Sequence, residues 1–113
     1  DVELFVETFS RKYVSRVKFA LSTKIPEYLS VCKPIFAVGP YYAASMQYLS
    51  DCAFCCYSDN SNDIESSLET MLFNKELCCK LSKMAYKKYE TRHLYSETAR
   101  KVWNIMIGSS ECK

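Results

Sequence analysis

Glycine and proline are scarce in this chain. Two glycines, Gly39 and Gly108, and three prolines occur among 113 residues. Two isolated glycines exclude a glycine-rich loop of the kind that cradles phosphates in P-loop proteins and Rossmann folds. Hydrophobic residues make up 49% of the chain and charged residues 25%, which is typical of a globular domain and argues against a disordered or low-complexity segment. The length corresponds to one domain, residues 1–113.

Histidine occurs once, as His93, so no Ser/His/Asp or Cys/His constellation for nucleophilic catalysis is expected, and His93 is predicted to be a surface or linker residue. The seven cysteines comprise two adjacent pairs, one Cys-x-x-Cys in an apolar run and an odd member: Cys32, Cys52, Cys55, Cys56, Cys78, Cys79 and Cys112. A second paired ligand set at zinc-knuckle spacing is lacking. We therefore expect no metal site and no disulfide framework, but reduced cysteines that act mostly as small buried hydrophobic residues.

Long apolar runs and a strong excess of one charge are also missing. No 18-residue apolar segment occurs, and no charged start precedes a long apolar run, so neither a membrane span nor a signal peptide is expected in these residues. The net charge of +2 is too small to indicate a nucleic-acid or membrane partner. We expect a cytoplasmic protein without a nucleic-acid partner, and membrane association of a longer protein stays open.

Three short apolar runs alternate with stretches of helical periodicity. The runs 2–6, 34–38 and 52–57 resemble parallel strands buried on both faces. Helices are predicted over the ranges 23–31, 41–49, 63–74, 76–89 and 96–107, with an interruption at 91–95. This alternation predicts an α/β fold with a parallel sheet of about three strands. We expect the apolar side of the last helix, with Trp103, both to pack on this sheet and to contact another domain.

Basic residues concentrate in two places. Residues 10–21 show no sustained period and predict a long loop with at most one helical turn, at the end of a parallel strand where open α/β folds place their ligands. Its four cations either neutralise a bound diphosphate or keep the loop soluble, and solubility is the simpler interpretation of each one singly: Arg11, Lys12, Arg16 and Lys18. The lysines of the range 76–89 are expected to form a solvated helix face: Lys80, Lys83, Lys87 and Lys88.

The segment 22–40 carries the most specific pattern of the chain, a helix start that suits an anion followed directly by a buried strand. Ser22 and Thr23 are expected to cap the helix, and proline is tolerated in its first turn. Lys24 adds a positive charge there, although the helix dipole disfavours a cation at this end. Amide groups at a helix start attract phosphate, and Glu27 stands close enough to accept hydrogen bonds from the hydroxyls of an attached sugar. The order predicts the βα arrangement of a nucleotide site.

This run resembles the donor-site segment of retaining glycosyltransferases of the GT-B architecture, and within it the large family 4. Many members carry Thr-Lys-hydrophobic-x-Glu-Tyr, a small-residue turn, Lys-Pro and an apolar strand. The positions that match are Thr23, Lys24, Ile25, Glu27, Tyr28, Lys33, Pro34 and the strand 35–38. The similarity extends from about Glu3 to about Met106, with the central run as its specific part. Two positions depart from the pattern: Phe19 stands where many members have glutamate, and Cys32 replaces the usual glycine of the turn.

The resemblance implies a Rossmann-like three-layer sandwich fragment, the later part of a C-terminal donor-binding domain. The implied reaction transfers a hexosyl group from a nucleoside diphosphate sugar to a hydroxyl acceptor, with no metal or other cofactor required. Glu27 would hold the ribose, and Lys24, with the backbone around Ser22 and Thr23, would face the diphosphate. Lys24 is the residue that we expect to stabilise the leaving group. The missing N-terminal domain would bind the acceptor and contact the helices of about 76–107, so the chain alone should be inactive.

Further positions are weaker candidates, because simple structural roles explain them equally well. Glu7 and Thr8 at the end of the first strand are candidates for a sugar pocket, and Gly39 and Pro40 for the exit of the second strand beside a base pocket. Two alternatives to an active transferase stay open. One is a non-catalytic α/β module that binds a protein partner through its basic loop and C-terminal helices. The other is a degenerate transferase, which the departures at Phe19 and Cys32 permit.

Overall fold

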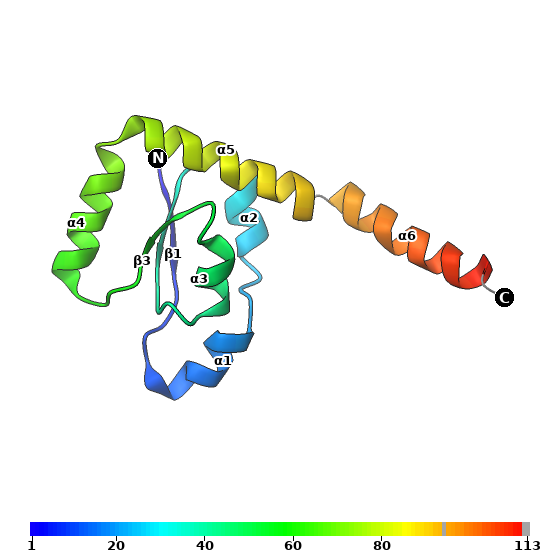
Figure 1. The fold of residues 1–113 in the computed structure, drawn as a ribbon, viewed down its shortest axis with the longest axis horizontal. Coiled ribbons are helices and arrows are strands. Elements are labelled where there is room, and N and C mark those ends of the chain that lie inside the picture. Colours follow the sequence, from blue (N-terminus) through cyan, green and yellow to red (C-terminus); the bar gives the residue numbers. More distant parts are fainter. Residues whose placement is uncertain (94, 112–113) are drawn as a thin grey trace.

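The computed structural model describes residues 1–93 and 95–111, and Figure 1 gives their course. Strands and helices alternate along the chain, as expected. The elements in order are β1 (Glu3–Val6), a 3-10 turn (Arg11–Tyr13), α1 (Val14–Phe19), α2 (Ile25–Ser30), β2 (Ile35–Val38), α3 (Ala44–Leu49), β3 (Phe54–Cys56), α4 (Ser61–Leu72), α5 (Lys75–Arg92) and α6 (Tyr95–Glu111).

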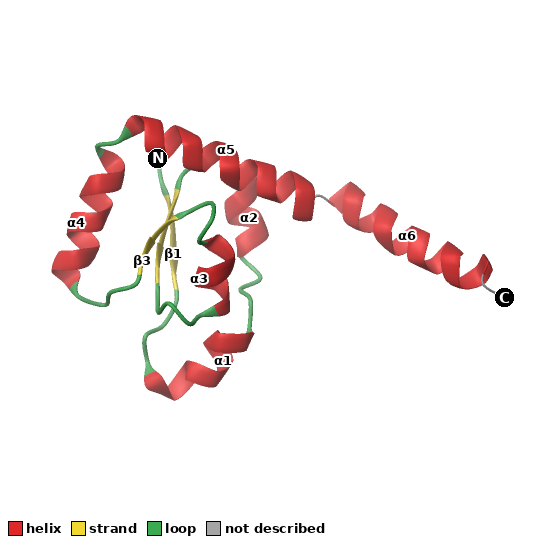
Figure 2. Cartoon of the chain, viewed as in Figure 1, coloured by secondary structure: helices red, strands yellow, loops and turns green. Residues whose placement is uncertain are grey.

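The three strands form one open parallel sheet in the order β1-β2-β3 (Figure 2). Phe5 pairs with Ala37 of β2, and Ala37 pairs in turn with Cys55 of β3. Since all three strands run the same way, their carboxyl ends lie at one edge of the sheet. The predicted α/β class and the three-stranded parallel sheet are therefore confirmed.

The central strand β2 is the only described strand that is buried along its whole length. Ile35 and Ala37 point into a core that α1, α2, α3 and α5 cover, and Phe36 and Val38 point into a second core that α4 closes with Met71. The sheet thus lies between two helical layers (Figure 1). Both faces of this central parallel strand are covered by helices, which is why the run 35–38 is apolar without alternation.

The edge strand β1 differs from the prediction that both of its faces are buried. Only Phe5 is buried, and it packs edge-on against Tyr28 of α2. Leu4 and Val6 are 57% and 62% exposed. They lie on the side of Phe36 and Val38, where α4 packs near β3 and leaves β1 uncovered. A mostly apolar run with little alternation therefore did not distinguish an edge strand from a central one.

A helix replaces much of the loop that the sequence predicted over residues 10–21. The 3-10 turn leads into α1, whose one buried side chain is Val17. Six helical residues with one apolar anchor are too few to display a period of 3.6, so periodicity could not reveal this helix. No side chain caps its first turn. The helix therefore depends on the contact of Val17 with the core.

Asparagine side chains fix where the two long helices begin. Asn60 accepts a hydrogen bond from the Asn62 amide, so α4 starts at Ser61, two residues before the predicted start. Asn74 was expected to end α4, but its side chain accepts from the Leu77 amide at 3.0 Å and caps α5 instead. Such caps satisfy amides that have no partner within the helix.

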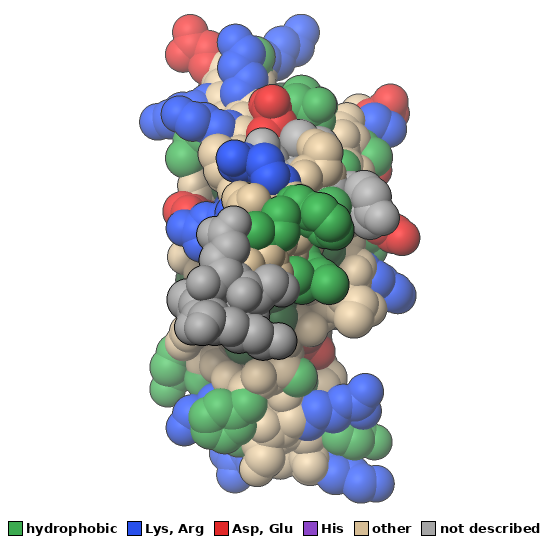
Figure 3. Space-filling model, turned by 90° about the vertical axis from the view of Figure 1, so that its right-hand side faces the viewer, with side chains coloured by type: hydrophobic (Ala, Val, Ile, Leu, Met, Phe, Trp, Pro, Cys, Tyr) green, Lys and Arg blue, Asp and Glu red, His purple; other side chains and the backbone are tan. Residues whose placement is uncertain are grey.

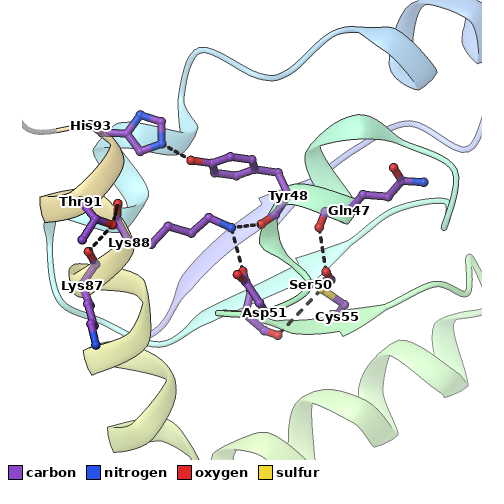
Figure 4. Close-up of polar contacts among 10 residues, drawn as sticks. Gln47, Tyr48, Ser50, Asp51, Cys55, Lys87, Lys88, Thr91 and His93 are labelled. Atoms are coloured by element: carbon purple, nitrogen blue, oxygen red, sulfur yellow. Dashed lines mark hydrogen bonds and ion pairs between the residues drawn. The ribbon is translucent and has the colours of Figure 1, made fainter. Parts of the chain in front are cut away.

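A partly buried lysine joins α5 to the end of α3 (Figure 4). Lys88 was expected on a solvated face, but its side chain is only 15% exposed. Its ammonium donates to Asp51 Oδ1 at 2.7 Å and to the Tyr48 carbonyl oxygen, and it lies 3.8 Å from the centroid of the Tyr48 ring. The Tyr48 hydroxyl in turn hydrogen bonds to Nε2 of His93. His93 therefore belongs to the contact between α3 and α5.

The last helix, α6, leaves the body of the protein and extends away from the sheet (Figure 1). The expectation that its apolar side packs on the sheet was therefore wrong. Val102 and Trp103 are more than half exposed. The turn at His93 sends α6 along a line that continues away from the core, so the apolar side of the helix has no sheet beneath it. Contact with another domain stays a prediction.

Cys32 has an unusual backbone conformation. Among the described residues it is the one non-glycine residue with a positive φ, 55°. It follows the end of α2, a position where a left-handed residue commonly ends a helix and glycine is preferred because it has no Cβ. The usual glycine of the resembling sequences thus has a physical reason at this position.

We expect Cys32→Gly to raise the free energy of unfolding by about 0.5–1 kcal/mol, because it removes the steric cost of the left-handed conformation. Urea denaturation followed by circular dichroism measures the change. Val31→Gly is the matched control, since Val31 has an ordinary φ of −86° and glycine there should only destabilise. A Cys32→Gly variant that loses as much stability as Val31→Gly contradicts the expectation.

His93 should make stability depend on pH. Partial burial and the nearby cations Lys88 and Arg92 lower the pKa of its imidazole. On acidification the unfolded chain therefore takes up a proton at a higher pH than the folded chain does. The contribution of His93 to stability is complete above the unfolded pKa of about 6.5 and is lost as the pH falls through the lower folded pKa.

As the pH is lowered from about 7.5 to about 5.5, denaturation should thus show that the free energy of unfolding falls. In His93→Gln this free energy should fall less steeply with pH. Asp51→Asn serves as control. Partial burial raises the Asp51 pKa, but the hydrogen bond and charge of Lys88 outweigh this effect and hold it below 3.8. The carboxyl therefore does not titrate in this window. Equal slopes in the original chain and His93→Gln would contradict the assignment.

Candidate functional site

A cleft of about 460 Å³ lies at the carboxyl end of β1. One wall is Glu7 and Thr8, directly after the strand, and the opposite wall comes from α1 and the segment that joins it to α2. The lining residues are Glu7, Thr8, Tyr13, Arg16, Val17, Ala20, Leu21, Ser22 and Thr23. Ligands of open α/β sheets bind at this edge of the sheet. Four of the predicted site residues, at positions 7, 8, 22 and 23, are therefore brought together.

A second, smaller cleft of about 280 Å³ adjoins the first, because Glu7 and Ser22 line both. Lys24 and Tyr28 complete its wall on the side of α2. The side chain of Lys24 is exposed and forms no ion pair within the described residues. The two clefts together bring five of the eight predicted residues to one end of the molecule.

The segment before α2 differs from the predicted helix start. The helix begins at Ile25 with Lys24 at its N-cap, and no side chain caps it. Ser22 Oγ accepts from the Lys24 amide at 3.3 Å and so forms a small turn ahead of the helix. The expectation that Ser22 or Thr23 caps the helix was therefore wrong, whereas a proline in its first turn is confirmed by Pro26.

A buried hydroxyl on α3 holds this segment in place. Ser45 is fully buried, and its Oγ accepts from the Ser22 amide at 2.9 Å. Since the amides of Ser22 and Lys24 are thus occupied, they are not available to an anion. Within the described residues, the Thr23 and Glu27 amides have no acceptor. These two N–H groups are the ones at the helix start that a ligand could use.

Gly39 is needed for space and not for a special φ, since neither glycine has a positive φ. A Cβ at Gly39 would stand 2.9 Å from Glu7 Cβ and 2.9 Å from Met46 Cγ. Gly39 therefore lets the end of β2 approach the Glu7 wall of the clefts. Pro40 is buried and lines neither cleft.

Glu27 is exposed in the first turn of α2 and lines neither cleft. It lies one turn beyond Lys24 on the same short helix. The structure thus places Glu27 beside the clefts at the helix start, outside the residues that form their walls.

Two of the cysteines, Cys52 and Cys55, are poor nucleophiles in this fold. Burial is the main cause that raises the pKa of Cys52 to about 12, and burial likewise raises that of Cys55, so both thiols stay protonated at neutral pH. The six cysteines that the structure describes are unbridged, and Cys112 lies outside the described residues. Only Cys52 and Cys56 are fully buried, and Cys32 and Cys79 are exposed, so the expectation of mostly buried cysteines holds in part.

The described residues contain no group of three or more Cys, His, Asp or Glu side chains placed to hold a metal ion. None of their helices combines the length and the apolar character needed to cross a membrane.

Tyr13 and Ser45 contribute to the site and were missed because they depend on tertiary contacts, whereas Arg16 was considered only as one of four loop cations. Arg16 and Tyr13 reach the larger cleft only because residues 11–19 are helical, which periodicity did not indicate. Ser45 lies in a short helix whose sequence gives no sign that its hydroxyl faces the segment before α2. A serine among apolar residues at 43–49 was the one available signal.

We expect Gly39→Ala to lower the free energy of unfolding by about 1–3 kcal/mol, because the added methyl group overpacks the contact between β2 and Glu7. Thermal or urea denaturation measures the loss. Gly108→Ala is the matched control, since nothing stands within 4 Å of a Cβ there. Gly108 lies in α6, where alanine is the better helix former, so this control should be neutral or stabilising. Equal effects of the two substitutions would contradict the close approach.

No family model, curated protein or solved structure matches this chain. The likeness to GT-B glycosyltransferases therefore depends on the residues of the central run. What the structure adds is the mixed α/β fold with its three-stranded parallel sheet and the two clefts at the carboxyl edge of that sheet.

Proposed function

We propose that the two adjoining clefts bind the donor of a glycosyl transfer, a nucleoside diphosphate sugar, and that the chain is the donor-binding part of a GT-B glycosyltransferase. The observation that carries this proposal is the convergence of Glu7, Thr8, Ser22, Thr23 and Lys24 at the carboxyl edge of a parallel sheet. Five positions that the sequence indicated, from two separate segments, line these two adjoining clefts. A chance pattern in the run 22–28 would not require the end of β1 to lie opposite it.

The diphosphate is the part of the donor that this end of the molecule suits best. Arg16 and Lys24 supply two cations, and the Thr23 and Glu27 amides supply N–H groups without acceptors among the described residues. Departure of the diphosphate develops negative charge on its oxygens, so fixed dipoles and a nearby ammonium lower the energy of that step. Lys24 would do this without a proton transfer. A metal ion is not needed for this role.

The two carboxylates would contact different parts of the donor, Glu7 the transferred sugar and Glu27 the ribose. Glu7 and Thr8 offer acceptors in the larger cleft, where the transferred sugar would lie. Glu27, one turn along α2 from Lys24, would accept from the ribose hydroxyls and thereby orient the donor. This role requires the bound nucleotide to extend over the first turn of α2, beyond the residues that form the clefts. The acceptor would have to come from a part of the enzyme outside this chain.

An interaction module without nucleotide binding is the competing function, and the exposed apolar side of α6 is the observation that favours it. Val102 and Trp103 are open to a partner there. Such a module has no need of unpartnered amides beside two cations. Nucleotide binding therefore separates the two functions directly.

We expect uridine, guanosine and adenosine diphosphates, titrated into the 15N-labelled chain, to shift the amide signals of Thr23 and Glu27 for at least one base. Lys24→Ala should weaken that binding about five- to tenfold, the effect of losing one charge-assisted hydrogen bond. Lys83→Ala is the matched control, because it removes an exposed lysine of α5 away from the clefts.

Glu27 is tested with a dideoxynucleoside diphosphate, which lacks both ribose hydroxyls. The original chain should bind it about tenfold more weakly than the ribose form, and Glu27→Ala should bind both forms equally. A ribose preference that survives Glu27→Ala removes Glu27 from the assignment. No shift with any nucleoside diphosphate sinks the proposed function and leaves the interaction module.

A further inference from the structure

Positive charge is strongly segregated along this chain. Residues 8–26 contain five of the fifteen cations and none of the thirteen acids: Arg11, Lys12, Arg16, Lys18 and Lys24. The rest of the chain holds the other ten cations and all thirteen acids, so it is net negative. The net charge of +2 is thus the sum of a basic segment, residues 8–26, and a remainder that is net negative. Local charge of one sign, and not the total, determines attraction to a charged surface.

Within the part of the chain that the structure describes, none of these five cations forms an ion pair. The one ion pair found among the described residues joins Lys88 to Asp51, and neither of them lies in this basic segment. Only Arg16 and Lys24 line the clefts. Arg11, Lys12 and Lys18 are exposed and take no part in them. Donor binding therefore leaves three cations of this segment unexplained.

Apolar side chains are exposed among the same cations. Phe19 is 79% exposed, and Tyr13 and Leu21 are each at least two-fifths exposed. The ammonium groups of Lys12 and Lys18 lie 5.7 Å from the ring centroids of Tyr13 and Phe19, their neighbours in sequence. In the space-filling view, basic and apolar side chains gather at the lower end, which is the end that holds α1 (Figures 1 and 3).

We propose that the 3-10 turn and α1 attach this protein to the surface of an anionic lipid bilayer. Interfacial segments combine Lys and Arg with Phe, Leu or Tyr, because the cations attract anionic headgroups and the apolar groups enter the boundary between headgroups and acyl chains. This segment has both components, free of acids and open to solvent. The proposal concerns a surface contact and does not depend on nucleotide binding in the clefts.

A lipid surface suits this segment better than single-stranded nucleic acid does. Bases stack on aromatic rings, whereas an exposed leucine such as Leu21 has no stacking role and gains from entering a lipid boundary. The segment also lies at one end of the molecule, below the sheet (Figure 1), where a surface can reach it.

The test is sedimentation of the chain with vesicles of phosphatidylcholine alone and of phosphatidylcholine mixed with phosphatidylserine. We expect binding to the mixed vesicles only, and weaker binding as salt rises. Lys12→Gln combined with Lys18→Gln should lower the partition coefficient about twenty-fivefold, at about fivefold for each cation. Phe19→Ser should lower it about tenfold, through loss of apolar area in the boundary. All three side chains are exposed, so these variants should fold.

Matched controls come from elsewhere in the chain. Lys80→Gln combined with Lys83→Gln removes two exposed cations of α5, and Phe73→Ser removes a phenylalanine that is 86% exposed between α4 and α5. Neither control should change binding by more than about twofold. Equal losses in controls and test variants, binding that survives the test variants, or tighter binding to single-stranded RNA than to the mixed vesicles would each overturn the proposal. Sedimentation with vesicles of phosphatidylcholine alone would overturn the claim that anionic headgroups attract these cations.

Discussion

The burial of β2 on both faces is the constraint on which the other elements depend. A strand whose four side chains are all buried has to receive helices on both sides, and its neighbours must satisfy its backbone. Ile35 and Ala37 set the core beneath α2 and α3, and Phe36 stacks on Phe54 in the core beneath α4. Exposing either face of β2 would remove one of the two cores, so the fold needs the helices of both layers.

The position of the clefts follows from the same arrangement. Parallel strands bring their carboxyl ends to one edge, and the backbone ladder continues past them, with the Glu7 amide bonded to the Val38 carbonyl and the Gly39 amide bonded to the Cys56 carbonyl. Gly39 then closes the distance to Glu7, since any larger side chain would collide there. The wall of the clefts is thus an extension of the sheet, fixed by the core. The opposite wall is held by the buried side chain of Val17 and by the hydrogen bond from the Ser22 amide to Ser45 Oγ.

The strands, the long helices and the end of the sheet that bears the clefts could be predicted from the sequence. They have strong local signals: apolar runs, a period of 3.6 residues, and turn residues such as Gly39 and Pro40. The rest depends on contacts between distant segments. An apolar run alone did not indicate that β1 is an edge strand, because Leu4 and Val6 lose their cover only through the position of α4. The sequence predicted a solvated Lys88, because it does not show that α5 packs over the end of α3.

The helix α1, whose residues line the larger cleft, is held to the core by few contacts. A six-residue helix is unfavourable by itself, because nucleation fixes several residues for few hydrogen bonds. In α1 a single buried side chain, Val17, opposes that cost. Regions with few buried contacts open locally at low free energy, and binding elements are drawn from them. β2 and α1 therefore differ in how firmly they are held: the wall that continues β2 is fixed by the core, whereas α1, with its exposed cations, is anchored by one buried side chain and should open at a lower free energy.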